Sequence, residues 1–314
     1  LVLLVGALGA VLYGVRQVPA GPTPESAPSL AESARPAPLP EGAPETSARS
    51  PSASLSDDAC SFEEPAATDA VKRNARPFVV WVREATLRPD DRYDLVIHVH
   101  GGDAARRIMT PRAFPLVLAT LDKGSLSGDY KGTFPDRKSF DAAVASIDEA
   151  VTTVVGRPAR ADRIVLSSFS AGYGALGEVL ASLGDEAPPS GLILLDSLHA
   201  SYRSETTKEI DASSLEPFLA YARRALEGRG YFALTHSAIV PPGYASTSEV
   251  ATFLLQTLAV DSTPLEAKTT GLDLRRVAQE KGFVVRGYAG RDKGAHCAHL
   301  TLLPELVEGW MRAR

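Results

Sequence analysis

A serine at the junction of a predicted strand and a predicted helix is the residue of this chain best suited to covalent chemistry. Residues 163–176 read RIVLSSFSAGYGAL, so an apolar, β-branched run gives way to SSFSAG and then to a helix-forming run. A sharp strand-to-helix turn strains the residue at the turn, pushes its side chain outward, and requires small residues two positions before and after it. Ser168 and Gly172 meet that requirement. The pattern predicts an exposed Ser170 hydroxyl at a helix N-terminus, where negative charge is stabilised; an ordinary serine-rich loop is the alternative.

The histidines of the chain all end or follow predicted strands: they are His98, His100, His199, His236, His296 and His299. Ligands of parallel sheets bind at the carboxyl ends of the strands, so we expect these side chains at one edge, together with Ser170 and Asp196. A serine attacks a carbonyl only if a base accepts its proton and an acid orients that base. Imidazole suits the base because its pKa lies near neutral pH. The set predicts nucleophilic catalysis by serine, histidine and aspartate.

These segments resemble the α/β-hydrolase superfamily over roughly residues 78–314. The resemblance is carried by the serine turn, by the sequence HGG at residues 100–102 after a strand, and by GAHCAHLTLLPE at residues 294–305 before the last helix. Ser168 departs from the family pattern, which more usually has glycine there. The resemblance implies a serine hydrolase that cleaves an ester, amide or thioester through an acyl-enzyme, needs no cofactor, and has the chain order Ser…Asp…His.

The resemblance also implies a role for each partner of Ser170. The family commonly places its catalytic histidine before the last helix, with a proline soon after, which makes His296 the base and His299 the alternative. Asp196 ends a predicted strand and is our preferred acid, although a turn or helix-capping aspartate would occupy the same kind of position. Asp292 lies in a sequence that looks like the family's usual acid motif. Only three residues separate it from His296, however, which is too few for the helix and strand that normally lie between the acid and the histidine.

The oxyanion of the intermediate needs two backbone donors. The resemblance assigns one to the N–H of Ala171, directly after the nucleophile, and the other to the loop that contains Gly101 and Gly102. Glycines there allow backbone N–H groups to approach a ligand closely. His100 would orient this loop. An ordinary Gly-Gly turn is the alternative.

The elements that must position these residues alternate between strands and helices. The predicted strands are 78–83, 94–99, 116–121, 163–168, 191–196, 231–236 and 283–289, and the clearest helices are 138–154, 172–183, 215–227, 248–258 and 301–312. Most of the strands are continuous apolar runs, which is typical of a parallel sheet buried on both faces. The alternation predicts an α/β fold with a mostly parallel, doubly wound sheet of the α/β-hydrolase type.

The N-terminal part of the chain cannot contribute to that core. Residues 1–18 begin with a 15-residue apolar run, shorter than the roughly 20 residues of a membrane-spanning helix, which predicts a signal peptide or a membrane anchor. Residues 19–59 contain nine prolines and no aromatic residue, which predicts a disordered linker. Residues 60–314 form the expected hydrolase domain. We therefore expect an exported protein, periplasmic or extracellular, that is tethered to the membrane if residues 1–18 are retained.

The composition of the chain limits the classes of partner that we expect. The formal net charge is −5 and no basic stripe is present, so nucleic acid is not an expected partner. The two cysteines, Cys60 and Cys297, permit a disulfide in an exported protein, and two separate thiols are the alternative. The expected substrate is a small-molecule or envelope-derived acyl compound. The sequence leaves its identity, the bond type and the oligomeric state open.

Two other functions compete with the serine hydrolase. The strand-end histidines and Asp292 loosely resemble the metal site of barrel amidohydrolases, because neutral imidazoles are good zinc ligands. Such a barrel needs four strand–helix units between His100 and His199, and only two or three strands can be found there. It also leaves the turn at Ser170 unexplained, so we predict no metal site. The second competitor is a tethered binding domain that has lost its activity on the same fold.

Overall fold

The computed structural model describes residues 60–66, 68–184, 187–204, 206–269 and 271–313, and all of them fall within one compact unit. The predicted N-terminal segment (1–18) and the predicted linker (19–59) lie outside the described residues. Within the described part of the chain, no helix is both long and apolar enough to cross a membrane.

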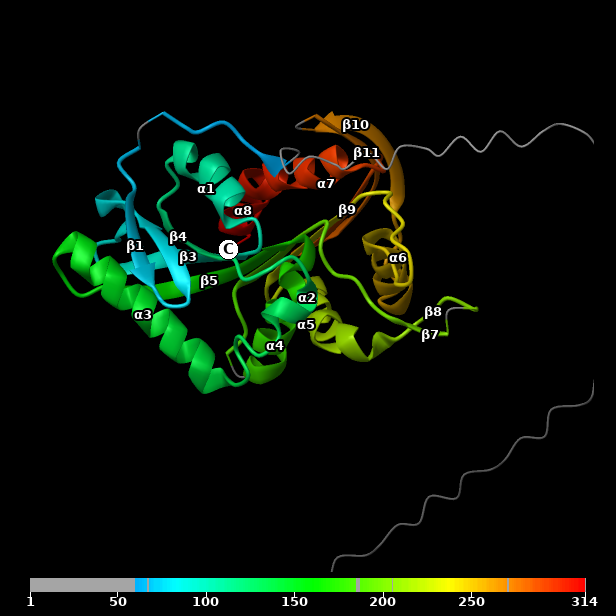
Figure 1. Ribbon diagram of the computed structural model, residues 1–314, viewed down its shortest axis with the longest axis horizontal. Coiled ribbons are helices and arrows are strands. Elements are labelled where there is room, and N and C mark those ends of the chain that lie inside the picture. The colour runs from blue at the N-terminus through cyan, green and yellow to red at the C-terminus, as the bar shows by residue number, and fades with distance from the viewer. Residues whose placement is uncertain (1–59, 67, 185–186, 205, 270, 314) are drawn as a thin grey trace, which may run out of the picture. The chain divides into compact units, whose positions relative to one another are not determined.

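Ten of the described strands form one sheet (Figure 1). They are β1 (Val71–Ala75), β2 (Phe78–Val82), β3 (Arg92–Val99), β4 (Leu116–Leu121), β5 (Arg160–Phe169), β6 (Gly191–Leu195), β9 (Tyr231–His236), β10 (Thr263–Thr269), β11 (Leu272–Glu280) and β12 (Phe283–Tyr288). Their order across the sheet is β1-β2-β4-β3-β5-β6-β9-β12-β11-β10. The remaining described strands, β7 (Tyr202–Ser204) and β8 (Glu209–Ile210), form a separate small hairpin.

The six central strands, from β4 to β12, run parallel, and antiparallel strands extend the sheet at both edges. The central strands are almost entirely buried because helices cover both of their faces, which explains their continuous apolar sequences. The sheet is open, with β1 and β10 at its edges. This mostly parallel sheet with flanking helices fits an α/β-hydrolase fold.

Helices cover both faces of the sheet. The described helices are α1 (Gly102–Met109), α2 (Ser127–Tyr130), α3 (Arg137–Val155), α4 (Tyr173–Leu183), α5 (Glu216–Leu226), α6 (Thr247–Thr257), α7 (Lys293–Ala298) and α8 (Leu303–Arg312). The buried side chains of α3, α4, α5 and α6 pack into one core cluster, and those of α1 and α8 into the cluster on the opposite face. Figure 1 shows these two layers on either side of the strands. Loops and turns follow the carboxyl ends of the parallel strands.

The predicted strands and helices are all present, with ends shifted by at most three residues. Three strands of the sheet were not predicted: β1, β10 and β11. Their sequences are largely polar, because each lies at or next to an edge where one face meets solvent. As a consequence, β9 does not immediately precede β12 in the chain, although the two strands are neighbours in the sheet.

Candidate active site

Ser170 lies at a sharp turn between β5 and α4. Strand β5 ends at Phe169, a single 3₁₀ turn covers Ser170–Gly172, and α4 begins at Tyr173. Ser170 has a φ of 47°, a left-handed backbone conformation that residues other than glycine rarely adopt. A Cβ atom on Gly172 would lie 2.1 Å from the carbonyl oxygen of Val99, so only glycine fits where the turn passes the end of β3. The strand–turn–helix arrangement predicted from the sequence is present.

A buried pair of serines holds the peptide of this turn. The Ser197 hydroxyl donates to the carbonyl oxygen of Ser170 at 2.7 Å and lies 2.8 Å from the Ser168 hydroxyl. Because the Ser197 proton is directed to Ser170, the Ser168 hydroxyl is the donor of the second bond. Both hydroxyls are fully buried. Ser168 therefore supports the strained residue through Ser197.

His296 is oriented by a carboxylate. It lies in α7, and its Nδ1 is 2.6 Å from Oδ2 of Asp196, the residue that follows β6. With the Nδ1 proton directed to the carboxylate, Nε2 is the nitrogen left to accept a proton from a nucleophile. The imidazole also packs against the ring of Phe169, with the ring centroids 4.4 Å apart. The structure therefore brings together two of the residues singled out in the sequence, Asp196 and His296.

Asp196 is nearly inaccessible to solvent and has several hydrogen-bond donors. Its Oδ1 accepts from the backbone N–H of Ser237 at 2.8 Å and from the hydroxyl of Thr247 at 2.6 Å. Burial alone would raise the pKa of Asp196, but the hydrogen bond from His296, the nearby imidazole of His299 and the bond from Thr247 hold that pKa well below its ordinary value. The carboxylate therefore stays ionised at any pH near neutrality.

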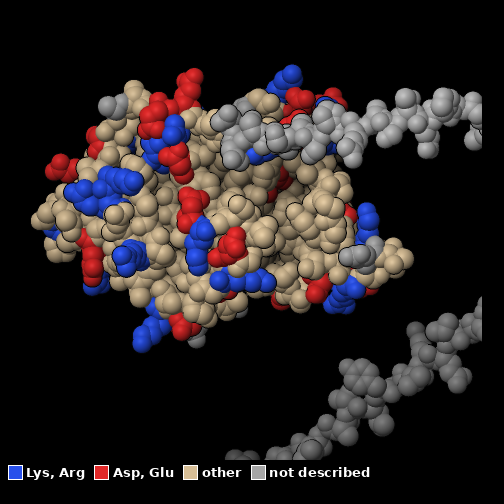
Figure 2. Space-filling model, viewed as in Figure 1, with Lys and Arg blue, Asp and Glu red and all other residues tan. Residues whose placement is uncertain are grey.

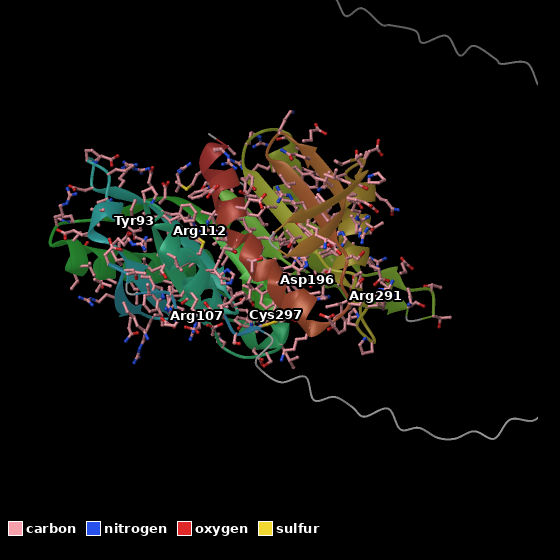
Figure 3. The ribbon with its side chains drawn as sticks, turned by 90° about the horizontal axis from the view of Figure 1, so that it is seen from above. Tyr93, Arg107, Arg112, Asp196, Arg291 and Cys297 are labelled. Carbon is pink, nitrogen blue, oxygen red and sulfur yellow. A yellow bond between two sulfur atoms is a disulfide. The ribbon has the colours of Figure 1, made fainter. Side chains whose placement is uncertain are left out.

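Ser170 and this pair line one cavity of about 330 Å³. Its wall also includes His199, Tyr244 and Ile239, and Arg291, Asp292 and Lys293 line it as well. In Figure 3 the labelled Asp196 and Cys297 lie beside the ribbon of α7, with Arg291 farther along. Within the described part of the chain, no hydrogen bond joins the Ser170 hydroxyl to His296. Catalytic hydrogen bonds of free enzymes are often long and tighten only when substrate binds.

The backbone amides of the predicted oxyanion loop bind a carboxylate. The backbone N–H of Gly101 donates to Oδ1 of Asp122 at 2.8 Å, and that of Gly102 lies 3.1–3.2 Å from both carboxylate oxygens. In this arrangement the carboxylate that follows β4 occupies both amides, so neither of them faces the cavity as a free donor, and their role in binding an oxyanion stays a prediction. His100 does belong to the loop framework, with its Nδ1 2.8 Å from the Tyr130 hydroxyl.

The two alternative catalytic residues are engaged elsewhere. His299 is fully buried, its Nδ1 lies 2.8 Å from the Thr235 hydroxyl, and burial lowers its pKa to about 4. Asp292 caps α7 by accepting from the backbone N–H of Ala295 at 2.8 Å. Neither of them takes the place proposed for His296 or Asp196.

Cys60 and Cys297 form a disulfide, with Cα atoms 4.9 Å apart and a sequence separation of 237 residues. The bridge therefore ties the start of the described chain to the helix that carries His296. Of the two possibilities left open by the sequence, the structure contains the bridge.

Several residues of the site were missed in the sequence. Ser197, Ser237 and Thr247 hold Asp196 and the serine turn, and Asp122 occupies the amides of the glycine loop. Asp122 could have been found, because it directly follows a predicted strand and so reaches the same edge as the histidines. The other three have common residue types with no distinctive spacing.

The metal-dependent alternative required a closed barrel, and the observed sheet is open. Among the described residues, no three His, Cys, Asp or Glu side chains are grouped as metal ligands would be. The histidines at the strand ends are spread along this edge with separate partners. His98, for example, is fully buried and bonds Ser167 at 3.0 Å.

No protein-family model matches the chain, and no curated protein matches its sequence. Among solved structures it is similar to TT1662 from Thermus thermophilus, with 13% identity, coverage of 79% of this chain and 100% of that chain, and a TM-score of 0.41. A second is LpqC, a poly(3-hydroxybutyrate) depolymerase from Bordetella parapertussis, with 14% identity, coverage of 78% and 94%, and a TM-score of 0.41. A third is S-formylglutathione hydrolase (FrmB) from Staphylococcus aureus, with 11% identity, coverage of 79% and 100%, and a TM-score of 0.41. The fold assignment rests on the strand order and the parallel pairing described above.

Proposed function

We propose that this protein is a serine hydrolase, of the carboxylesterase kind, in which Ser170 is the nucleophile, His296 the general base and Asp196 the acid that orients it. The observation that carries the proposal is that a serine in a strained strand-to-helix turn shares one cavity with an imidazole bonded to a buried carboxylate. Strained, outward-facing serines and oriented imidazoles are the two parts that acyl transfer requires.

The proposed reaction has two halves. Ser170 Oγ attacks the substrate carbonyl carbon while His296 Nε2 accepts the hydroxyl proton, and the carboxylate of Asp196 stabilises the imidazolium that forms. The imidazolium then gives this proton to the leaving oxygen as its bond to the acyl carbon breaks. In the second half, water attacks the acyl-enzyme and gives a proton to His296. That proton returns to Ser170 Oγ when the acid product leaves.

The negative charge of the intermediate lies at the N-terminus of the helical segment that begins at Ser170. The backbone N–H of Ala171 is the proposed donor there, and the dipole of α4 adds to it. Of the three donors expected from the sequence, Ala171 is the one that Asp122 does not engage.

We also propose an acyl substrate outside the cytoplasm, either a small molecule or a component of the cell envelope. The apolar N-terminal run and the Pro-rich segment after it support export, with the run as a membrane anchor if it is retained. The disulfide adds support, because such bonds persist mainly in oxidising compartments.

Hydrolysis of p-nitrophenyl acetate by the purified protein tests the proposal. Ser170→Ala should lower kcat by at least about 1,000-fold while leaving the circular dichroism spectrum unchanged, because the side chain faces a cavity. Ser214→Ala, an exposed serine outside the cavity, is the matched control and should match the wild type. A folded wild-type protein with no turnover would favour the inactive binding domain instead.

A further inference from the structure

Arg276 is a half-buried arginine whose guanidinium binds only neutral groups. It lies on β11, and in the described residues it forms an ion pair with no carboxylate. Its Nε–H donates to Nε2 of His236 at 3.0 Å, and its Nη2 donates to the Thr252 hydroxyl at 3.1 Å and to the Ser248 carbonyl oxygen at 3.4 Å. Partial burial of a charge without an ionic partner costs free energy, which these hydrogen bonds to neutral groups offset only in part.

These contacts adjoin the two groups that bind Oδ1 of Asp196. His236 precedes Ser237, whose backbone N–H donates to that oxygen at 2.8 Å. Ser248 follows Thr247, whose hydroxyl donates to the same oxygen at 2.6 Å. One guanidinium therefore joins the end of β9 to the start of α6, and each of these segments carries one donor.

The guanidinium also fixes the proton on His236. Arginine is always a donor, so His236 Nε2 must be the acceptor, and Nδ1 carries the proton that it donates to the Ser237 carbonyl oxygen at 3.0 Å. The buried ring faces Arg276 from β11, Asp196 after β6 and His299 after α7. Burial, together with the charge of Arg276, lowers the pKa of His236 to about 4, and the Ser237 carbonyl and Asp196 oppose this shift.

Gly287 leaves room for the pair. A Cβ atom at this position of β12 would lie 2.5 Å from His236 Nε2 and 2.8 Å from Cγ of Arg276. Both side chains therefore occupy a space that a larger residue would fill, and the contact between them is closely packed.

We propose that Arg276 is a positioning residue: through the neutral His236 and through α6, it holds the two donors that fix the carboxylate of Asp196 against His296. This inference rests on the proposed function, because Asp196 matters for catalysis only if His296 is the base. Neither Arg276 nor His236 lines the cavity. The role therefore predicts a loss in kcat with little change in KM.

The test compares Arg276→Met with Arg275→Met. Arg275 is the adjacent, exposed residue of β11 and pairs with Glu266 at the surface, so its loss controls for removal of a charge from this strand. Two readouts are needed: steady-state kinetics with p-nitrophenyl acetate, and ¹⁵N NMR of the imidazole nitrogens over pH 3.5–8, with His236 assigned from a His236→Gln sample.

In the wild type, His236 should show a proton on Nδ1 and titrate near pH 4. In Arg276→Met its midpoint should move toward the ordinary value of about 6.5, while kcat falls roughly tenfold to a hundredfold and KM changes by less than about twofold. Arg275→Met should change none of these. A kcat like that of the wild type in Arg276→Met, or an unmoved His236 midpoint, would overturn the inference.

Failure of the proposed function gives a different result. If a fluorophosphonate does not label the wild-type protein, the hydrolase proposal fails, and with it the catalytic role of Arg276. The NMR titration still decides whether Arg276 sets the charge of His236. If the wild type is labelled and Arg276→Met is labelled and turns over at the same rate, only the role of Arg276 is wrong.

Discussion

Asp196 Oδ2 lies 2.6 Å from His296 Nδ1, although the two residues are 100 positions apart in the chain. The contact directs the only proton of a neutral His296 to the carboxylate and leaves Nε2 as the acceptor. Because the pKa of Asp196 is held well below its ordinary value, the carboxylate stays ionised at any pH near neutrality. Protonation of Asp196 should therefore contribute nothing to the pH dependence of kcat/KM near neutral pH.

Asp196→Asn tests this contact. An asparagine amide donates to Nδ1 and so moves the imidazole proton to Nε2, the wrong tautomer for a base. We expect kcat to fall by about 10⁴-fold at pH 7.5 with little change in KM. Asp292 was considered as the alternative acid. Asp292→Asn should lower kcat by less than about tenfold, because an asparagine at this position can still cap α7. Equal losses in the two variants would contradict the assignment of Asp196.

Gly172→Ala tests the turn at Ser170. The added Cβ atom would lie 2.1 Å from the backbone carbonyl oxygen of Val99. Because this oxygen belongs to the end of strand β3, relieving the clash would require a shift of the backbone that costs free energy. We expect a loss of about 1–3 kcal/mol in the free energy of unfolding and a large loss of turnover. The Cβ atom added by Gly128→Ala in α2 would have no neighbouring atom within 4 Å, so this variant should keep the stability and the turnover of the wild type. Thermal unfolding and p-nitrophenyl acetate hydrolysis measure the two effects; wild-type values for Gly172→Ala would show that the turn is not tightly packed.

Three buried histidines predict how stability depends on pH. Burial lowers the pKa values of His98, His236 and His299 to about 3, 4 and 4, below the value of about 6.5 in an unfolded chain. Between pH 6.5 and 4 the unfolded state therefore binds more protons than the folded state, and the free energy of unfolding falls as pH falls.

Urea titrations at pH 7 and pH 5 measure this effect. The wild type should be less stable at pH 5. In His98→Asn the difference between the two pH values should be smaller, because one of the three groups is gone, even though the variant is less stable at pH 7. An equal or larger difference in the variant would mean that His98 is not held neutral by the fold.

The sequence was most informative where burial on both faces makes the pattern unambiguous. The apolar run before Ser170 identified β5, and the small residues around Ser170 identified the turn. Strand β11, which lies next to the edge strand β10, was missed because a half-exposed strand carries charges. Arg276 lies on this strand and was therefore not considered. The role of Asp122 was also missed, because a glycine loop looks the same whether its amides face a substrate or a carboxylate.

The disulfide provides a further prediction. The Cys60–Cys297 bridge closes a loop whose ends are 237 residues apart, for which chain-entropy estimates give about 5 kcal/mol of stabilisation. The double variant Cys60→Ser/Cys297→Ser should therefore unfold at a clearly lower temperature. Dithiothreitol should lower the unfolding temperature of the wild type and leave that of the double variant unchanged. An unfolding temperature in the wild type that reduction does not alter would contradict the prediction.

Charged groups of both signs are interspersed on the face shown in Figure 2. Surface pairs of this kind contribute little to stability, typically less than about 1 kcal/mol each. These surface pairs are therefore expected to contribute less to stability than the buried hydrogen bonds around Asp196.

Ser170 is expected to become covalently modified during turnover, and mass spectrometry of a fluorophosphonate adduct detects this modification. Reaction of the wild-type protein should add one probe per chain, and peptide mapping should locate it on Ser170. Asp196→Asn should react much more slowly and Ser170→Ala not at all. A folded wild-type protein that is not labelled, or an adduct on any residue other than Ser170, would show that Ser170 is not the nucleophile.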